Sequence, residues 1–299
     1  MIKYLYLNDK SNFDFCMEID KGSCTIGAFD GIHLGHLKIF NELINNSEGY
    51  KKIIITFSNH PDYSLNKRDD FGLINSNEEK IEIFNELGFD YAIFLDNMFL
   101  EYDYSNFNKL LKKLNIQKIF LGNDFHYGKN GIGDINTLKK DFLVSIVSDY
   151  YYNDKRLSST LIRLLLIEGK IKELNKLLVK PFSIEGTVKS GNKIGRTIGF
   201  KTANIDYSNK FRLLKFGVYS CNVIVNNKTY NGLANYGNNP TVNVNNKPIL
   251  EVYIIDFDKD IYGKNIIVIF RDYIREEKKF DSLEELKVQI KKDIEKVGN

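Results

Sequence analysis

The sequence predicts an α/β protein in two parts: a doubly wound parallel sheet, then a small antiparallel β-barrel and a terminal helix. Up to about residue 180, short continuous apolar runs alternate with segments of helical period, as expected for strands that helices cover on both faces. From Phe182 onward apolar residues recur mostly at every second position, which indicates antiparallel strands. The length of 299 residues suits two domains, which we expect at 1–180 and 181–299.

Five apolar runs are the expected strands of the first domain, and amphipathic segments between them are the expected helices. The strands are Cys24–Ile26, Lys52–Phe57, Tyr91–Leu95, Lys118–Leu121 and Leu143–Val147. The helices are Leu37–Asn46, Asn77–Leu87 and Tyr104–Leu114. Ser76 or Asn77 can cap the second helix, and Gly88 can end it. Because doubly wound sheets bind ligands at the carboxyl ends of their strands, the segment directly after Ile26 is a candidate site.

The second half begins with two short predicted helices and continues with strands of period two. The helices are Ser158–Leu166 and Ile171–Leu178, and the strands are Phe182–Val188, Tyr219–Val225, Lys228–Ala234, Ile249–Phe257 and Asn265–Phe270. Asn226-Asn227 is a hairpin signal between two of the strands. A capping box from Ser282 to Glu285 opens the last helix. Its apolar stripe, expected to pack on the core, is Leu283, Leu286, Ile290, Ile294 and Val297.

Composition and charge favour a cytoplasmic enzyme that acts on small molecules. The apolar fraction is 43% and the net charge only +3, and without a long basic block we expect neither nucleic acid nor a membrane as partner. The cysteines Cys16, Cys24 and Cys221 form no CxxC pair, which disfavours disulfides and zinc and suits a reducing compartment. The apolar start is too short for a signal peptide. We expect a monomer or weak homo-oligomer.

The segment Gly27–His36 (GAFDGIHLGH) carries the strongest functional signal. It joins a buried strand to a helix through a glycine-bearing turn, and His33 and His36 share one face because they lie three residues apart. A helix N-terminus offers free N–H groups and the positive end of the helix dipole, which hold phosphates. The histidines could instead ligate a metal, or one could be a capped core residue. Their context favours nucleotide phosphate binding.

A second phosphate signal lies about 120 residues later. Ser158, Ser159 and Thr160 place hydroxyls at a helix start, with Arg163 one turn further, and such groups converge on phosphate. Alone, this segment could be a simple N-cap. Together with the histidines it predicts a site in which an incoming phosphate attacks the α-phosphorus of ATP, while His33 and His36 stabilise the transition state and the second segment clamps the leaving pyrophosphate.

In the second domain one loop suggests chemistry and also has a plain structural alternative. The loop Gly191–Asn204 could lay backbone N–H groups along a polyphosphate, or could be a long barrel loop, and it does not fit the GxxxxGK[ST] pattern. Glu251 lies at the edge of an apolar strand, which by itself is compatible with a solvated side chain.

Four segments in order resemble the bacterial bifunctional riboflavin kinase/FAD synthetase family. They are Gly27–His36, Thr56–Pro61 (TFSNHP), Gly122–Gly128 (GNDFHYG) and Ser158–Arg163 (SSTLIR), against family patterns such as GxFDGxHxGH and SSTxIR. The resemblance implies a Rossmann-like nucleotidyltransferase domain that transfers AMP from ATP to FMN. It implies nucleotide contacts from Gly27, Phe29, Asp30 and Gly31, and a flavin side formed by Asp124, Phe125 and Gly128. Spacing alone would make residues 122–128 a turn.

The loop Gly191–Asn204 resembles GxxxGRxxGFPTAN of the kinase half of the same family. This implies a six-stranded riboflavin kinase-like barrel that phosphorylates riboflavin with ATP, with Thr202 and Asn204 contacting Mg²⁺, a cation that prefers oxygen ligands. Glu251 takes the place of the family's catalytic base, which would accept the proton of the ribityl 5′-hydroxyl. The resemblance also implies cofactor contacts from Gly191, Gly195, Arg196, Gly199, Asn235 and Arg275.

One departure from the family pattern is Lys201, where the family has proline. Lysine removes the backbone stiffness of proline and adds a charge beside the expected Mg²⁺ site. We therefore expect a retained kinase with weaker ATP–Mg²⁺ binding. Three rivals stay open: an adenylyltransferase with a degenerate kinase domain, a flavin-binding regulator without turnover, and a cytidylyl- or pantetheine-type nucleotidyltransferase. Lys201 is the feature that favours the first, whereas the barrel has no place in the last.

Overall fold

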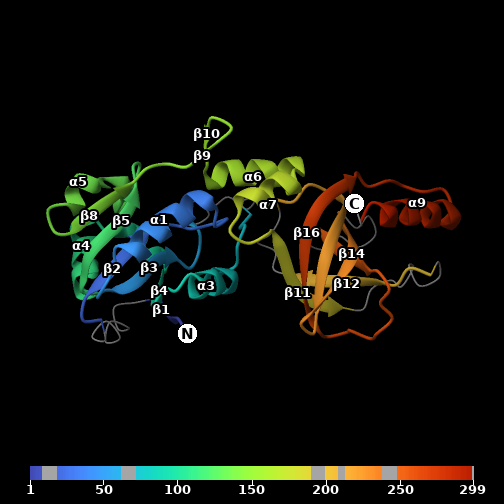
Figure 1. The fold of residues 1–299 in the computed structure, drawn as a ribbon, viewed down its shortest axis with the longest axis horizontal. Helices are drawn as coiled ribbons and strands as arrows, with labels where there is room; N and C mark the ends of the chain where they lie inside the picture. Colours follow the sequence, from blue (N-terminus) through green and yellow to red (C-terminus); the bar gives the residue numbers. More distant parts are fainter. Residues whose placement is uncertain (9–18, 62–71, 190–198, 208–212, 238–247, 298–299) are drawn as a thin grey trace. The chain divides into compact units, whose positions relative to one another are not determined.

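The computed structural model describes residues 1–8, 19–61, 72–189, 199–207, 213–237 and 248–297. Its contacts divide the chain into two compact units, Met1–Ser159 and Thr160–Asn299 (Figure 1). The two short helices after Ser158 thus group with the barrel in these contacts, and the domain boundary expected at residue 180 stays a prediction. No helix in the described part of the chain is long and apolar enough to cross a membrane.

The first unit is built on a parallel sheet. Within the described residues its strands are β1 (Lys3–Leu7), β2 (Gly22–Ile26), β3 (Lys51–Phe57), β4 (Tyr91–Leu95), β5 (Ile116–Gly122) and β8 (Leu143–Val147). They lie in the order β1-β4-β3-β2-β5-β8. The chain runs from β2 toward β4 on one side and continues at β5 on the other, so the order reverses beside β2. Such a switch point is where doubly wound sheets bind ligands.

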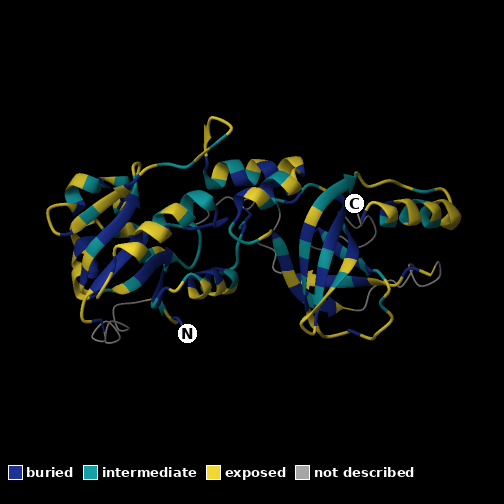
Figure 2. Ribbon diagram, viewed as in Figure 1, coloured by how far each residue is buried: buried dark blue, intermediate teal, exposed yellow. Residues whose placement is uncertain are grey.

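The central strands are buried, whereas the covering helices expose their outer faces (Figure 2). The helices are α1 (Leu34–Asn45), α3 (Asn77–Glu86), α4 (Tyr104–Lys113) and α5 (Ile135–Leu138), with 3₁₀ turns η2 (Asn97–Glu101) and η3 (Lys129–Gly131). Two short hairpins also lie in the described part of this unit: β6 (His126–Tyr127) with β7 (Gly133–Asp134), and β9 (Tyr151–Tyr152) with β10 (Lys155–Arg156). The capping box of α3 runs between Ser76 and Glu79, and Gly88 follows the helix with φ 84°.

The second unit contains a closed antiparallel barrel, as expected. The helices α6 (Ser159–Glu168) and α7 (Ile171–Leu177) precede the strands β11 (Ser183–Lys189), β12 (Thr202–Tyr207), β13 (Gly217–Val225), β14 (Lys228–Gly237), β15 (Ile249–Ile254) and β16 (Asn265–Arg275). The barrel closes in the order β11-β12-β15-β14-β13-β16. Asn226 and Asn227 both have positive φ, 48° and 61°, which confirms the hairpin turn between β13 and β14.

The last helix, α9 (Leu283–Glu295), departs from its prediction in two details. The Ser282 hydroxyl accepts from the Glu285 N–H at 3.2 Å, but the Glu285 carboxylate accepts from the N–H of Asp281, so the expected capping box is only half formed. Leu283 is 53% exposed and does not belong to the packed stripe. The stripe begins further along: Ile290, Ile294 and Val297 pack against Val218 and Leu233 of the barrel.

Candidate functional site

The two histidines of the Gly27–His36 motif lie at the start of α1. His33 is the N-cap residue, and its Nδ1 accepts a hydrogen bond from the backbone N–H of His36 at 3.3 Å. The two imidazoles stack with ring centroids 3.8 Å apart and an interplanar angle of 13°. Gly35 permits this arrangement, because a Cβ there would lie 3.0 Å from the His33 ring. The cap bond makes Nδ1 the acceptor, so a neutral His33 carries its proton on Nε2.

Both imidazoles are neutral at pH 7. Burial lowers the pKa of His33 to about 4, and the charge of Arg156 lowers it further. Burial also holds the pKa of His36 well below its usual value, with smaller contributions from His33 and Lys80. Within the described residues, His33 Nε2 and His36 Nδ1 are buried and make no hydrogen bond. Buried polar atoms are normally paired, so these nitrogens fit a polar ligand better than a purely structural role.

Ser159 and Asp30 connect the two phosphate-binding segments that the sequence predicted. The Ser159 hydroxyl donates to the Asp30 carbonyl at 2.7 Å, which holds Ser159 against the histidine loop. The Asp30 carboxylate is fully buried and accepts from the backbone N–H groups of Ile74 and Asn75 at 2.9 and 3.1 Å. It therefore holds the chain before α3. A nucleotide contact from Asp30, or from Gly31 with its φ of 61°, stays a prediction.

Gly27 and Phe29 support the histidines through packing. Phe29 has a positive φ of 45° and is 4% exposed, and its ring meets that of His36 edge to face at 5.3 Å. A Cβ at Gly27 would lie 2.9 Å from the Phe29 ring. Gly27 thus lets the Phe29 ring pack beneath His36. This packing explains the glycine, and a nucleotide contact from Gly27 stays a prediction.

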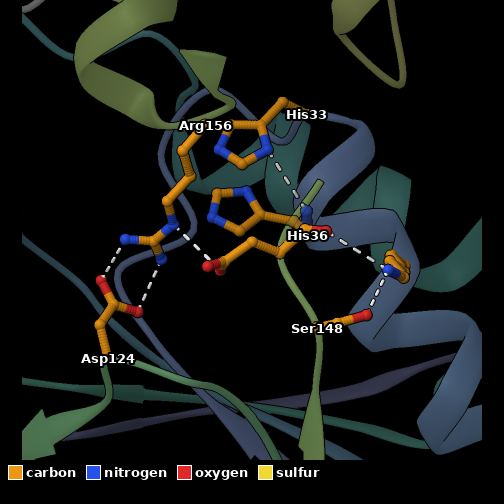
Figure 3. A network of polar contacts seen from close by, with 7 residues as sticks. His33, His36, Asp124, Ser148 and Arg156 are labelled. Carbon is orange, nitrogen blue, oxygen red and sulfur yellow. Dashed lines mark hydrogen bonds and ion pairs between the residues drawn. The ribbon is translucent and has the colours of Figure 1, made fainter. Parts of the chain in front are cut away.

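Arg156, which the sequence analysis missed, is held beside the histidines by two carboxylates (Figure 3). Its NH1 and NH2 donate to Asp124 at 2.6 and 2.7 Å, and its Nε lies 3.0 Å from Asp149. Asp124 follows β5 and Asp149 follows β8, so both stand at carboxyl ends of the sheet. The Arg156 hydrogen bond lowers the pKa of Asp124. A basic residue two positions before Ser158 was the signal that could have revealed Arg156.

The other residues of the first motifs have less distinctive surroundings. Phe125 stacks on Tyr127 at 5.7 Å and packs on the core. Gly128 has φ 72°, and a Cβ there would lie 2.9 Å from the backbone nitrogen of Tyr104, so the fold itself requires glycine. Ser158 precedes α6, while Thr160 and Arg163 lie on that helix and belong to the second unit.

The barrel brings the predicted kinase residues into one row. Asn204 on β12 and Asn235 on β14 are the cross-strand partners of Glu251 on β15. Alternation places these three side chains on the outer face, because their chain neighbours Ala203, Ala234 and Val252 are buried inside. Burial raises the pKa of Glu251, and the nearby Glu277 carboxylate raises it further. Two amides and a carboxyl group with a raised pKa thus lie side by side.

Thr202 precedes Asn204 by two residues on β12, so their side chains share a face. The sequence pattern predicts a loop for both residues, whereas they form a barrel strand beside β15. The side-chain oxygens of Thr202 and Asn204 fit Mg²⁺, which binds few protein oxygens and keeps waters and phosphates as further ligands. Gly191, Gly195 and Arg196 lie outside the described residues. Gly199 has φ 86° and open space around its Cα.

Arg275 anchors the terminal helix. Its Nε and NH2 lie 2.9 and 2.8 Å from Oδ2 of Asp293, which is 1% exposed on α9. This buried pair accounts for Arg275 structurally, and its predicted cofactor contact stays a prediction. The bend that follows Arg275 brings Glu277 against β14, where it accepts from the Asn235 amide at 3.3 Å.

Lys201 borders a pocket of about 170 Å³ on the barrel. Its ammonium pairs with the carboxylate of Asp258, and both residues line the pocket together with Thr202. The pocket is lined by Val188, Lys201, Thr202, Ala203, Val252, Ile254, Phe257, Asp258, Lys259, Asp260, Ile261 and Tyr262. The Lys201 charge therefore has a carboxylate partner on the next loop and does not stand alone beside Thr202.

Comparison with known proteins matches both halves of the chain. A riboflavin kinase family model matches residues 178–299, and an FAD synthetase family model matches residues 17–161. The bifunctional riboflavin kinase/FMN adenylyltransferase of Listeria monocytogenes is 35% identical over 98% of this chain and 96% of its own length. The enzyme of the same name from Buchnera aphidicola is 39% identical over 93% of each chain.

A solved structure has the same fold over the whole length. The crystal structure titled a macrolide-efflux protein from Streptococcus pneumoniae is 29% identical, with a TM-score of 0.89, and covers 100% of this chain and 99% of its own. The efflux function in that title concerns the other protein. The two family models and the full-length relatives, together with the histidine motif and the closed barrel, show that this chain belongs to the bifunctional riboflavin kinase/FMN adenylyltransferase family.

Proposed function

We propose that the stacked histidines form the centre that makes FAD from FMN and ATP, and that the row around Glu251 makes FMN from riboflavin and ATP. The chain thus carries out two successive steps of flavin cofactor synthesis. The observation that carries the first assignment is the pair of buried imidazole nitrogens, His33 Nε2 and His36 Nδ1, that have no hydrogen-bond partner among the described residues. For the second it is the row of Asn204, Glu251 and Asn235.

In the adenylyl transfer, an oxygen of the FMN phosphate attacks the α-phosphorus of ATP and pyrophosphate leaves. The neutral His33 donates its Nε2 proton as a hydrogen bond to a phosphate oxygen, so it acts through hydrogen bonding rather than through a positive charge. The stack keeps both rings in place without reorganisation, which is the kind of preorganised donor that stabilises developing charge. The first-turn N–H groups of α1 add their partial positive charge.

In the phosphoryl transfer, the ribityl 5′-hydroxyl attacks the γ-phosphorus of ATP, the bond to the bridging oxygen breaks so that ADP leaves, and the hydroxyl proton passes to the Glu251 carboxylate. The raised pKa of Glu251 suits a general base. A carboxylate whose pKa lies closer to neutral pH binds the abstracted proton more strongly. Thr202 and Asn204 would hold Mg²⁺, which supplies charge neutralisation at the phosphates when bound. FMN leaves this row and rebinds in the first unit. An assay in which an FMN trap failed to intercept the product would contradict this release.

We further propose that the chain works in the cytoplasm as a monomer or weak homo-oligomer, with small molecules as its partners rather than nucleic acid or membranes. Cys24 and Cys221 are buried free thiols whose pKa burial raises, as suits a reducing compartment. Sizing chromatography with light scattering measures the oligomeric state.

One time course tests the whole proposal. Purified protein, riboflavin, ATP and Mg²⁺ should give FMN first and FAD second when followed by HPLC. FMN supplied alone with ATP should give FAD and pyrophosphate. If no FMN forms from riboflavin but FAD forms from FMN, the chain is a monofunctional adenylyltransferase. If neither product forms, the chain is a flavin-binding regulator.

Replacing Arg156 by lysine should weaken FAD formation by roughly 10- to 100-fold, because lysine keeps the charge but loses the fork that contacts two carboxylates and can contact phosphate oxygens. FAD formation from FMN is measured as kcat/KM for FMN and for ATP. Lys155, the neighbouring exposed residue on β10, gives the control K155R, which should leave both values unchanged. An R156K variant with unaltered kcat/KM would show that the Arg156 guanidinium has no role in FAD formation.

Replacing Lys201 by proline should strengthen ATP–Mg²⁺ binding in the kinase reaction by several-fold, because it restores a rigid backbone before Thr202 and removes the ion pair with Asp258. The KM for ATP in FMN formation measures this, while the FAD reaction of the same variant is the internal control. Unchanged ATP affinity and turnover would show that Lys201 has no such cost.

A further inference from the structure

Glu277 is a charged residue that the two reactions above do not use, yet its carboxylate lies against the catalytic row of the barrel. It follows β16 by two residues. Its Oε1 accepts a hydrogen bond from Nδ2 of Asn235 at 3.3 Å. A Cβ built on Gly237 would lie 2.0 Å from the same oxygen and 2.2 Å from the carboxyl carbon. The carboxylate therefore occupies the space above Gly237, which only glycine leaves open.

This contact decides which way the Asn235 amide faces. A carboxylate oxygen only accepts hydrogen bonds, so the amide must turn its NH₂ group toward Glu277. The carbonyl oxygen Oδ1 is then the remaining polar end of Asn235. Because Asn235 is the cross-strand partner of Glu251, an acceptor oxygen stands beside the carboxylate that is proposed to take the substrate proton.

We propose that Glu277 is a positioning residue for the kinase reaction: it orients Asn235 so that its carbonyl oxygen accepts a hydrogen bond from a hydroxyl of the substrate polyol beside Glu251. The ligand class is therefore a polyol chain, with one hydroxyl read by Glu251 and a neighbouring hydroxyl read by Asn235. Sites that hydrogen-bond a substrate hydroxyl discriminate strongly against analogues that lack it. This inference rests on the proposed role of the row around Glu251.

Two variants test the position of Glu277 by independent routes. E277A removes the acceptor, whereas G237A displaces it while leaving Glu277 in the sequence. Gly237 has no positive φ and the clash is with the end of a long side chain, so alanine fits the backbone there. Both should lower kcat/KM for riboflavin by about tenfold, the effect of losing roughly one hydrogen bond. E277Q keeps an oxygen that can accept from Asn235 and should restore most of the loss.

The readouts separate positioning from general damage to the fold. The KM for ATP and the conversion of supplied FMN to FAD should be unchanged in every variant. The parent enzyme should prefer riboflavin to its 4′-deoxy and 3′-deoxy analogues. For one of these two analogues, the preference should be smaller in E277A and in G237A. The adjacent Glu276, which pairs with Lys215 at 3.4 Å, gives the matched control E276A, and this variant should behave as the parent protein.

The outcomes that overturn the inference are distinct from failure of the proposed function. If E277A and G237A keep the parent kcat/KM for riboflavin, or if the KM values for riboflavin and ATP rise together, Glu277 has no positioning role. If E277Q fails to restore activity in a folded protein, the acceptor is not what matters and the proposal is also wrong. The proposed function is tested separately by E251Q. An E251Q enzyme that still forms FMN at the parent rate would show that the row around Glu251 is not the catalytic site.

Discussion

Replacing His36 by alanine should stop the formation of FAD while FMN still accumulates. The imidazole of His36 stacks on His33 at 3.8 Å, so its loss removes one donor and frees the ring of the other. Loss of a single preorganised donor at a transition state lowers turnover by about 100- to 1,000-fold. The measurement is an HPLC time course that starts from riboflavin, with a second one that starts from FMN.

The kinase reaction of the same H36A protein is the internal control, because its proposed residues all lie on the barrel. Normal FMN formation shows that the variant is folded. Loss of both activities in a variant with an unchanged melting curve would contradict two separate sites. The rates need no correction for protonation of His33 near pH 7, because burial keeps its pKa at about 4. As the pH falls through this value the imidazole gains a proton and its Nδ1 can no longer accept the cap bond.

Replacing Glu251 by glutamine should affect the other reaction. FMN formation should fall by about 100- to 10,000-fold, the usual contribution of a general base, while FAD still forms from supplied FMN. Glutamine has nearly the same shape and retains an acceptor oxygen, so it removes proton transfer with little change in packing. The rate of FMN formation at saturating riboflavin and ATP measures the effect.

A glutamate elsewhere on the barrel gives the matched control. Glu185 is exposed on β11 and bonds only the side chain of Asn265 among the contacts described. E185Q should form FMN at the parent rate. An E251Q enzyme with undiminished FMN formation would show that another group accepts the proton, whereas loss in E185Q as well would point to a general electrostatic effect.

The sequence predicts the sheet because buried parallel strands leave continuous apolar runs, and it predicts the barrel because antiparallel strands leave an alternating pattern. The five strands predicted for the sheet all form, with ends shifted by at most two residues, whereas the five predicted for the barrel form with ends shifted by up to five. It misses β1 although Tyr4–Leu7 is a short apolar run, because this strand passes from exposed to buried at the sheet edge and has neither a fully buried nor an alternating pattern. It also misses β12, because Thr202 and Asn204 are polar residues on the outer face of a strand.

The candidate site divides in the same way. Residues that lie together in sequence, such as His33 and His36, are found by their spacing. Arg156 is not, because its partners Asp124 and Asp149 come from the ends of two different strands, and no local pattern records that meeting. Likewise, the contact of Glu277 with Asn235 joins residues 42 positions apart. Contacts between residues far apart in sequence form only when the chain folds, so a single sequence does not show them.

Arg156 has a consequence for how this surface can evolve. Surface hairpins usually tolerate inserted or deleted residues, and the turn Asn153-Asp154 between β9 and β10 looks like a place for such changes. Yet the side-chain period of a strand is two, so a shift of one residue would turn Arg156 to the opposite face. We expect length changes in this hairpin to occur in pairs, or to be accompanied by a replacement for the guanidinium.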